Sequence, residues 1–162
     1  MIEQETKILK LMSEITGRMD MTEFAKKTDL TPNQIVGHMQ QLAKEGFLRK
    51  VGGGYALTAK AKKVLKASEP VPENLKFQFY VALGQPLNVW AGSIQEFLEV
   101  IPTVDAASLE FHVGRDDFEN WLRNAVGDAD FAEELAKLKS NNPKGEELRA
   151  AILAAAQKNN YL

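Results

Sequence analysis

The chain of 162 residues contains no cysteine, only 2 histidines and no long apolar run. The absence of cysteine excludes disulfides, thiolate metal sites and a cysteine nucleophile, and it suits a reducing compartment. No apolar run approaches the roughly 20 residues that a membrane-spanning helix needs. The polar, acidic N-terminus lacks the features of a signal peptide. These absences predict a cytoplasmic protein that does not span a membrane.

Charge and aromatic content divide the chain into two unlike parts. The net charge is −2, but residues 1–68 hold +5 and residues 69–162 hold −7. The second part also holds ten of the aromatic side chains. Two prolines interrupt the helical pattern at Ala67-Ser-Glu-Pro-Val-Pro72. We therefore predict a first domain over 1–67, a linker over 68–74 and a second domain over 75–162.

The first domain begins with two predicted helices. An apolar stripe at helical spacing predicts a helix over about residues 3–15, which Gly17 ends. The stripe consists of Ile8, Leu11, Met12 and Ile15. A second helix is expected from about Met21, with Asp20 as its N-cap and Glu23 completing a capping box.

Thr31-Pro32 marks the start of a third helix, because threonine caps well and proline suits the first helical position. Its inward face is predicted to comprise Ile35, Met39, Leu42 and Ala43. The opposite face is polar, and Asn and Gln side chains there are suited to bidentate hydrogen bonds with adenine in the major groove. Its residues are Asn33, Gly37, Gln40, Gln41 and Lys44, flanked by Gln34 and His38. Gly37 inside a helix costs about 1 kcal/mol relative to alanine, which a close approach to DNA or another backbone would explain.

Two short strands are predicted after this helix, over residues 47–51 and 55–57. Gly52-Gly-Gly54 joins them and permits a positive φ in the turn. Thr58 is expected to cap a further, lysine-rich helix. The order of a short helix, a turn, a second helix and a glycine-tipped hairpin is that of a winged helix-turn-helix.

Two stretches carry a resemblance to a known family. Leu42-Ala-Lys-Glu-Gly-Phe-Leu48 and Gly52-Gly-Gly-Tyr-Ala-Leu-Thr-Ala-Lys-Ala-Lys-Lys-Val-Leu65 resemble the winged helix-turn-helix of prokaryotic transcriptional regulators. Ala61 stands where that family usually has glycine. The resemblance covers residues 1–66 and implies binding of double-stranded DNA. The base-facing residues would be Asn33, Gln34, Gly37, His38 and Gln41. The phosphate-facing residues would be Thr31, Lys44, Arg49, Lys50, Lys60, Lys62 and Lys63.

The second domain is predicted to open with a hairpin of strands over 76–83 and 87–91, joined at Gly84-Gln-Pro86. Ser93 and Glu96 form a capping box for a helix that Pro102 ends. Residues 105–113 fit either a helix capped by Asp105 or a strand, and we favour the helix.

Further helices are predicted towards the C-terminus. Asp116 and Glu119 form a cap and box for the next helix, and Gly127 stops it. Another helix is capped by Asp128 or Asp130. Asn142-Pro143 is expected to open the last helix. Its alanine-rich segment, residues 150–156, predicts either a dimer-packing face or packing against the domain's own core.

From Phe77 to about Leu138, this domain resembles an uncharacterised prokaryotic domain family of unknown function. The stretches that carry the resemblance are Gly84-Gln-Pro, Ser93-Ile-Gln-Glu-Phe97 and Phe111-His-Val-Gly-Arg-Asp-Asp-Phe-Glu-Asn-Trp121. It implies no activity, only a shared structural or ligand-facing element. The candidate ligand or partner site is His112, Arg115, Asp116 and Trp121. Acid–base or metal chemistry at His112 is the weaker hypothesis, because Asp116 and Glu119 are explained as caps and histidines are usually structural.

The expected fold class is mostly α with small β elements, comprising the N-terminal winged helix-turn-helix and a helix-rich α+β C-terminal domain. We expect a DNA-binding transcriptional regulator whose C-terminal domain dimerises or binds an effector or protein partner. A homodimer would match two operator half-sites. The alternative is a non-enzymatic adaptor that uses the winged helix to bind a protein. We expect no catalytic residues, metal or cofactor.

Overall fold

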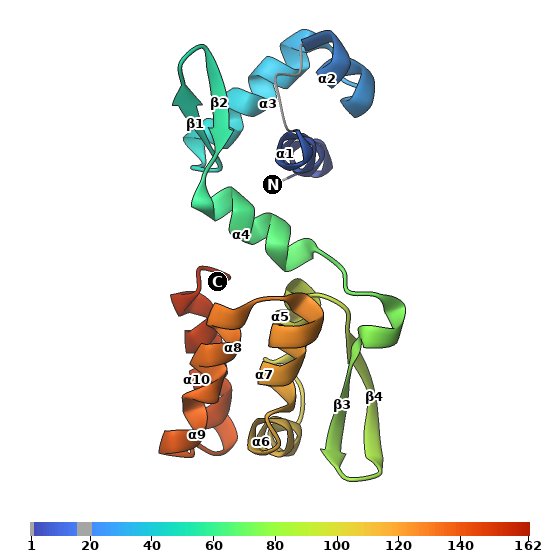
Figure 1. Ribbon diagram of the computed structural model, residues 1–162, viewed down its shortest axis with the longest axis vertical. Coiled ribbons are helices and arrows are strands. Elements are labelled where there is room, and N and C mark those ends of the chain that lie inside the picture. The colour runs from blue at the N-terminus through green and yellow to red at the C-terminus, as the bar shows by residue number, and fades with distance from the viewer. Residues whose placement is uncertain (1, 16–20) are drawn as a thin grey trace. The chain divides into compact units, whose positions relative to one another are not determined.

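The computed structural model describes residues 2–15 and 21–162, so the predictions for Gly17 and Asp20 lie outside the described residues. The chain divides into two compact units, Met1–Lys66 and Ala67–Leu162. Each unit has its own hydrophobic core. The described chain is mostly helical and contains two antiparallel sheets of two strands each (Figure 1). The predicted fold class, mostly α with small β elements, is therefore confirmed.

Three helices build the core of the N-terminal unit: α1 (Glu3–Glu14), α2 (Met21–Thr28) and α3 (Pro32–Lys44). The predicted start of α3 is confirmed, because the Thr31 hydroxyl accepts a hydrogen bond from the Gln34 backbone N–H at 3.2 Å. The Gln34 side chain accepts one from the Thr31 N–H at 2.9 Å, which completes a capping box. Ile35 and Leu42 of α3 are fully buried in this core.

A hairpin follows α3 and consists of β1 (Leu48–Val51) and β2 (Gly54–Leu57). Gly46 ends α3 with a φ of 87°, and the Phe47 N–H bonds to the Leu42 carbonyl at 2.9 Å, as in a Schellman motif. Gly52, the first of two residues between the strands, has a φ of 58°, as the sequence predicted. The last helix, α4 (Ala59–Ser68), has the Thr58 hydroxyl as its cap.

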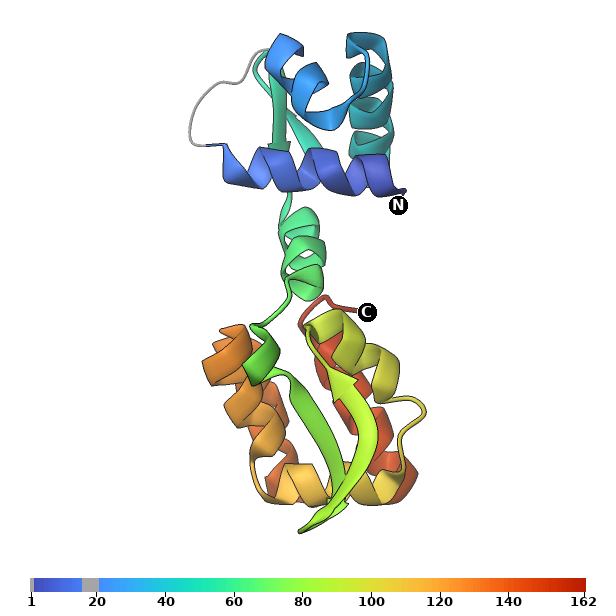
Figure 2. The ribbon, with the colours of Figure 1, turned by 90° about the vertical axis from the view of Figure 1, so that its right-hand side faces the viewer.

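The C-terminal unit is a hairpin packed on a group of helices (Figures 1 and 2). The hairpin strands are β3 (Phe77–Ala82) and β4 (Gln85–Ala91), preceded by a 3₁₀ turn (Glu73–Leu75). The helical elements are α5 (Ile94–Val100), α6 (Ala106–Gly114), α7 (Asp117–Trp121), a π-helical turn (Leu122–Val126), α8 (Ala129–Ala136), α9 (Leu138–Asn141) and α10 (Gly145–Lys158). Phe77 and Phe79 of β3 point into the core between these layers.

Local capping rules predicted several helix starts in this unit. The Ser93 hydroxyl accepts the Glu96 N–H at 3.1 Å, although the Glu96 carboxylate accepts from Gly92 instead of completing the box. Asp105 caps α6, so the ambiguous segment 105–113 is a helix. Asp128, not Asp130, caps α8 through the Phe131 N–H at 3.0 Å.

Three predictions about this unit were wrong. Asp116 does not cap α7: it has a left-handed backbone with φ of 63° and makes no capping hydrogen bond. The last helix begins at Gly145, because Asn142 instead ends α9 with a φ of 45°. The expected linker contains Val71, which is buried in the C-terminal core and donates its N–H to the Gly92 carbonyl at 2.8 Å.

Candidate functional sites

The polar face of α3 is open to solvent in the N-terminal unit. Asn33, Gly37 and Gln41 are exposed, while Ile35 and Leu42 on the opposite side are buried. A Cβ added to Gly37 would meet no atom within 4 Å among the described residues. The close backbone contact that would explain this glycine is therefore not made within the described chain.

Three of the predicted base-facing side chains are already engaged within the protein. Gln34 belongs to the capping box of α3, and Gln41 donates to the Glu45 carboxylate at 2.7 Å. The His38 ring is turned towards α1, where its Nδ1 lies 3.5 Å from Oε1 of the buried Glu5. Asn33 has no side-chain hydrogen bond among the residues that the structure describes.

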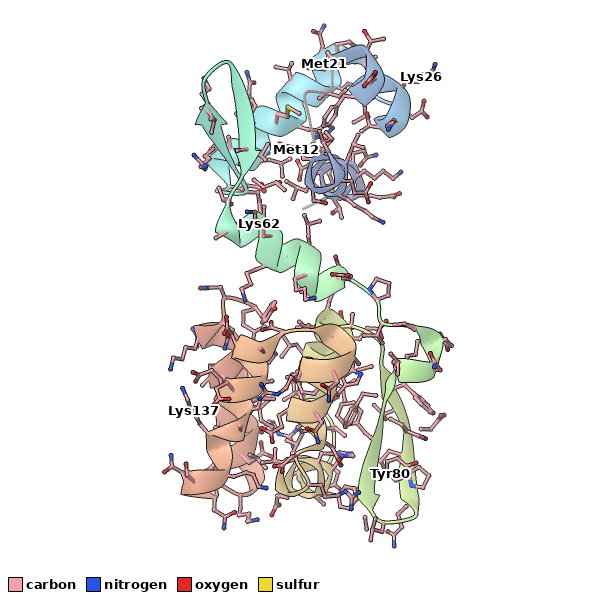
Figure 3. All side chains as sticks on the ribbon, in the orientation of Figure 1. Met12, Met21, Lys26, Lys62, Tyr80 and Lys137 are labelled. Carbon is pink, nitrogen blue, oxygen red and sulfur yellow. The ribbon has the colours of Figure 1, made fainter. Side chains whose placement is uncertain are left out.

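The predicted phosphate-facing cations fall into two groups. Lys44, Arg49, Lys50 and Lys62 are exposed, with Arg49 and Lys50 on strand β1 of the hairpin. Lys60 has an internal role, because its Nζ donates to the Glu45 carbonyl at 2.7 Å and lies 4.5 Å from the centre of the Phe47 ring. Lys63 is half-buried, and Thr31 is exposed at the start of α3, where it serves as the cap. Lys26 of α2 (Figure 3) and its neighbour Lys27 add two exposed cations that sequence reasoning did not select.

An apolar groove of about 810 Å³ also lies in this unit, lined by residues of α1, α2, α3 and the hairpin. Its lining includes Met12 and Met21 (Figure 3), Met39, Val36 and Val51. Met21, Val36 and Val51 are 37%, 42% and 47% exposed. The helical pattern had assigned Met12 and Met39 simply to the core. Helical periodicity identifies an inward face, but it does not reveal whether neighbouring elements close over that face.

The C-terminal unit contains a cavity of about 600 Å³ between the β3–β4 hairpin and helices α6 and α7. Three of the four predicted site residues, His112, Arg115 and Trp121, line it. Asp116 lies outside the lining and pairs with Lys139 at 2.7 Å, which holds the pKa of the Asp116 carboxyl below its usual value. The residues that sequence reasoning missed come from several elements. They include Tyr80 (Figure 3), Trp90, Phe111, Asp117 and Asn120.

His112 is almost fully buried and both of its ring nitrogens are engaged. Nε2 accepts the backbone N–H of Tyr80 at 2.8 Å, so the ring proton must be on Nδ1, which donates to the Asp117 carboxylate at 2.8 Å. Burial lowers the pKa of His112, although the hydrogen bond with Asp117 opposes that shift. In this arrangement the ring links β3 to α7 and has no free nitrogen for a metal or for proton transfer.

The remaining polar groups around the cavity differ in how far they are engaged. The Trp121 indole donates to the Leu75 carbonyl at 2.7 Å, and Lys76 pairs with Glu73 at 2.9 Å. Arg115 donates from Nε to Asp117 at 3.3 Å, while its guanidinium lies 5.2 Å from the centre of the Phe111 ring. The two Nη groups of Arg115 have no partner among the described residues.

Within the described part of the chain, no group of three or more His, Cys, Asp or Glu side chains is arranged to hold a metal ion. No helix within residues 2–15 and 21–162 has the length and apolarity to cross a membrane.

Comparison with known proteins assigns a family to the C-terminal part. The model of a family of unknown function (DUF5752) matches residues 66–157, more than half of the chain. This agrees with the uncharacterised domain family expected for this part, whereas nearly all of the N-terminal unit lies outside the match. No curated protein and no solved structure matches the chain significantly.

Proposed function

Because the chain belongs to a family of unknown function, DUF5752, we propose a function from the features of its two units. We propose that it is a DNA-binding transcriptional regulator of the cytoplasm. The observation that carries the proposal is the solvent-exposed polar face of α3, with Arg49 and Lys50 exposed on the hairpin that follows. A helix with such a face fits the major groove of duplex DNA, and cations on a wing suit the phosphate backbone.

In this proposal, the polar side chains of the N-terminal unit have three different roles: base contact, phosphate contact and support of the fold. Asn33 has an unengaged amide, and Gln41 reaches a base after giving up its hydrogen bond to Glu45. Gly37 lets the helix backbone approach the groove closely. The exposed cations Lys44, Arg49, Lys50 and Lys62 neutralise phosphates, which supplies most of the affinity. His38 and Lys60 support the fold instead of contacting DNA.

The C-terminal unit supplies regulation in this proposal. Its net charge of −7 disfavours DNA, so it serves in dimerisation or in binding an effector or a protein partner. Its only buried histidine has both ring nitrogens engaged, which supports a binding role over acid–base catalysis.

Salt-dependent binding of duplex DNA by the intact protein tests this function. We expect binding at low salt, and we expect the logarithm of the association constant to fall linearly with the logarithm of the salt concentration. The slope should be about −0.9 per phosphate contact. The double variant Arg49→Gln, Lys50→Gln should reduce the magnitude of that slope by roughly 2. Lys7→Gln is the matched control, because Lys7 is an exposed lysine on α1 that pairs with Glu3. A folded protein that does not bind duplex at low salt, or a double variant that behaves like the control, would overturn the proposal.

The apolar groove favours a second candidate, an adaptor that binds a protein through the same unit. Exposed Met21, Val36 and Val51 are suited to the apolar face of a partner helix. Val36→Ser should weaken such binding and, because it changes no charge, should leave the salt slope of DNA binding unchanged. The two functions are therefore distinguished by one variant on α3.

A further inference from the structure

The cavity of the C-terminal unit has a size and lining that suit a small molecule. Its volume of about 600 Å³ lies within the roughly 300–1,000 Å³ of ligand sites in proteins. Tyr80 and Phe111 are half-buried, and Trp90 is 49% exposed, so all three present ring surface to the site. Aromatic side chains with accessible faces favour a flat, aromatic ligand.

The frame of the cavity is fixed by hydrogen bonds that hold its walls together. His112 connects the Tyr80 backbone to Asp117, and the Trp121 indole connects α7 to Leu75 ahead of β3. These side chains are buried, being 3% and 8% exposed. A lining held in this way is pre-organised, which reduces the entropic cost of binding.

Arg115 gives the cavity an anion-binding group. Asp117 holds its Nε and the Phe111 ring lies beside its guanidinium, so the side chain is positioned while both Nη groups remain without partners among the described residues. The second cation of the lining, Lys76, is already paired with Glu73. A guanidinium with open Nη donors suits bidentate binding of a carboxylate or phosphate.

We propose that this cavity binds a small planar aromatic anion, with its ring against Tyr80, Trp90 and Phe111 and its carboxylate or phosphate on the Nη groups of Arg115. Asn120, which is exposed and lines the same cavity, supplies a further polar contact. The site lies wholly within the C-terminal unit. It is independent of DNA binding, and its test needs no DNA.

The test is a titration of the intact protein by two-dimensional NMR with naphthoate, naphthyl phosphate, neutral naphthamide and non-planar cyclohexanecarboxylate. The chain has 2 tryptophans, Trp90 and Trp121, and both line the cavity, so their indole N–H signals report on it directly. Trp90→Phe assigns the two signals. We expect saturable shifts with the planar anions and binding about tenfold weaker with naphthamide and cyclohexanecarboxylate. The tighter of the two planar anions identifies carboxylate or phosphate as the natural group.

Two variants locate the binding. Arg115→Gln should weaken naphthoate about tenfold and remove its advantage over naphthamide. Arg123→Gln, which removes an exposed arginine paired with Glu133, is the control and should leave all affinities unchanged. Without any probe, a Trp121 indole signal at the wild-type position verifies the fold of each variant. The proposal is overturned if no probe shifts the indole signals, if naphthoate and naphthamide bind equally, or if Arg115→Gln binds naphthoate like the control.

Discussion

At the scale of single residues, the hydrogen bonds of His112 make it a structural link. Truncation of His112 to alanine leaves the partly buried Tyr80 N–H without its acceptor, which costs roughly 1–3 kcal/mol of unfolding free energy. Asn120→Ala removes an exposed side chain that has no hydrogen-bond partner among the described residues, so its unfolding free energy should stay within about 0.5 kcal/mol of wild type. Urea unfolding followed by tryptophan fluorescence measures both, because both tryptophans belong to the C-terminal unit. Equal stabilities of the two variants would contradict the role of His112.

The protonation of His112 also predicts how stability depends on pH. Burial lowers its pKa in the folded protein, whereas the unfolded chain has the ordinary pKa of about 6.5. The unfolded chain therefore takes up the proton first as the pH falls. The contribution of His112 is fully present above about pH 6.5 and is lost as the pH falls towards the lower folded value. Between pH 7.5 and 5.5, the unfolding free energy of wild type should fall by more than that of His112→Ala, because only wild type has the lowered pKa of His112. Equal losses in the two proteins would contradict this prediction.

Substitution of Gly37 should have opposite effects on the stability of the protein and on its affinity for DNA. The site has space for a Cβ, so Gly37→Ala should stabilise α3 by about 1 kcal/mol. In the DNA-binding proposal the same methyl group lies at the groove, so duplex affinity should fall while stability rises. Thermal unfolding and fluorescence anisotropy with labelled duplex measure the two effects. A more stable variant with unchanged DNA affinity would remove Gly37 from the interface.

At the scale of elements, Arg149 of α10 ties the end of α5 to the C-terminal helix. Its Nη1 donates to the Ile101 and Val104 carbonyls at 2.6 and 2.7 Å, and its side chain is only 15% exposed. Arg149→Met should therefore cost roughly 1.5–3 kcal/mol, as expected for hydrogen bonds that involve a charged group. Replacement of Lys137 (Figure 3) by methionine removes only an exposed pair with Glu134 and should cost less than about 1 kcal/mol. Urea unfolding compares them, and a smaller effect at Arg149 would contradict this assignment.

Elements whose signals are local could be predicted from the sequence. Thr31, Ser93 and Asp105 cap their helices because the acceptor and the N–H lie within three residues. The prediction that Asp116 caps α7 was wrong, because the Asp116 carboxylate pairs with Lys139, which is distant in sequence, and the Asp116 backbone is left-handed. A cap can be recognised from neighbouring residues, but a competing ion pair across the fold cannot.

In the candidate sites, too, features that depend on neighbouring residues could be predicted, whereas contacts between distant residues could not. The residue types on the outer face of α3 follow from helical periodicity, whereas the internal partners of His38 and Lys60 come from α1 and from the end of α3. The cavity of the C-terminal unit required β3, β4 and α6 to be assembled before Tyr80, Trp90 and Phe111 lined one space. The sequence predicted the hairpin and the helix, but not the tertiary packing between them.

At the scale of the whole molecule, two recognition helices would strengthen DNA binding in the proposed function. A single DNA-binding module buries only about 600–1,000 Å² of protein surface, and a two-fold dimer doubles that contact at half-sites about 34–36 Å apart. The alanine-rich segment of α10 does not provide its whole surface to a partner, because Ala155 and Ala156 are buried in the core of their own unit. Ala150 and Ala154 of the same segment are exposed, so the outer side of α10 stays available for the dimer contact.

We expect the intact protein to be a homodimer and to bind one duplex as a dimer. Sedimentation equilibrium should give twice the chain mass of 18.0 kDa for the free protein, and titration of duplex should saturate at two chains per site. The stoichiometry should be the same for the Arg49→Gln, Lys50→Gln variant, since its substitutions lie in the N-terminal unit and weaken only affinity. A protein that stays monomeric at high concentration and binds DNA one chain at a time would remove dimerisation from the C-terminal unit. The acidic unit would then keep only its ligand or partner role.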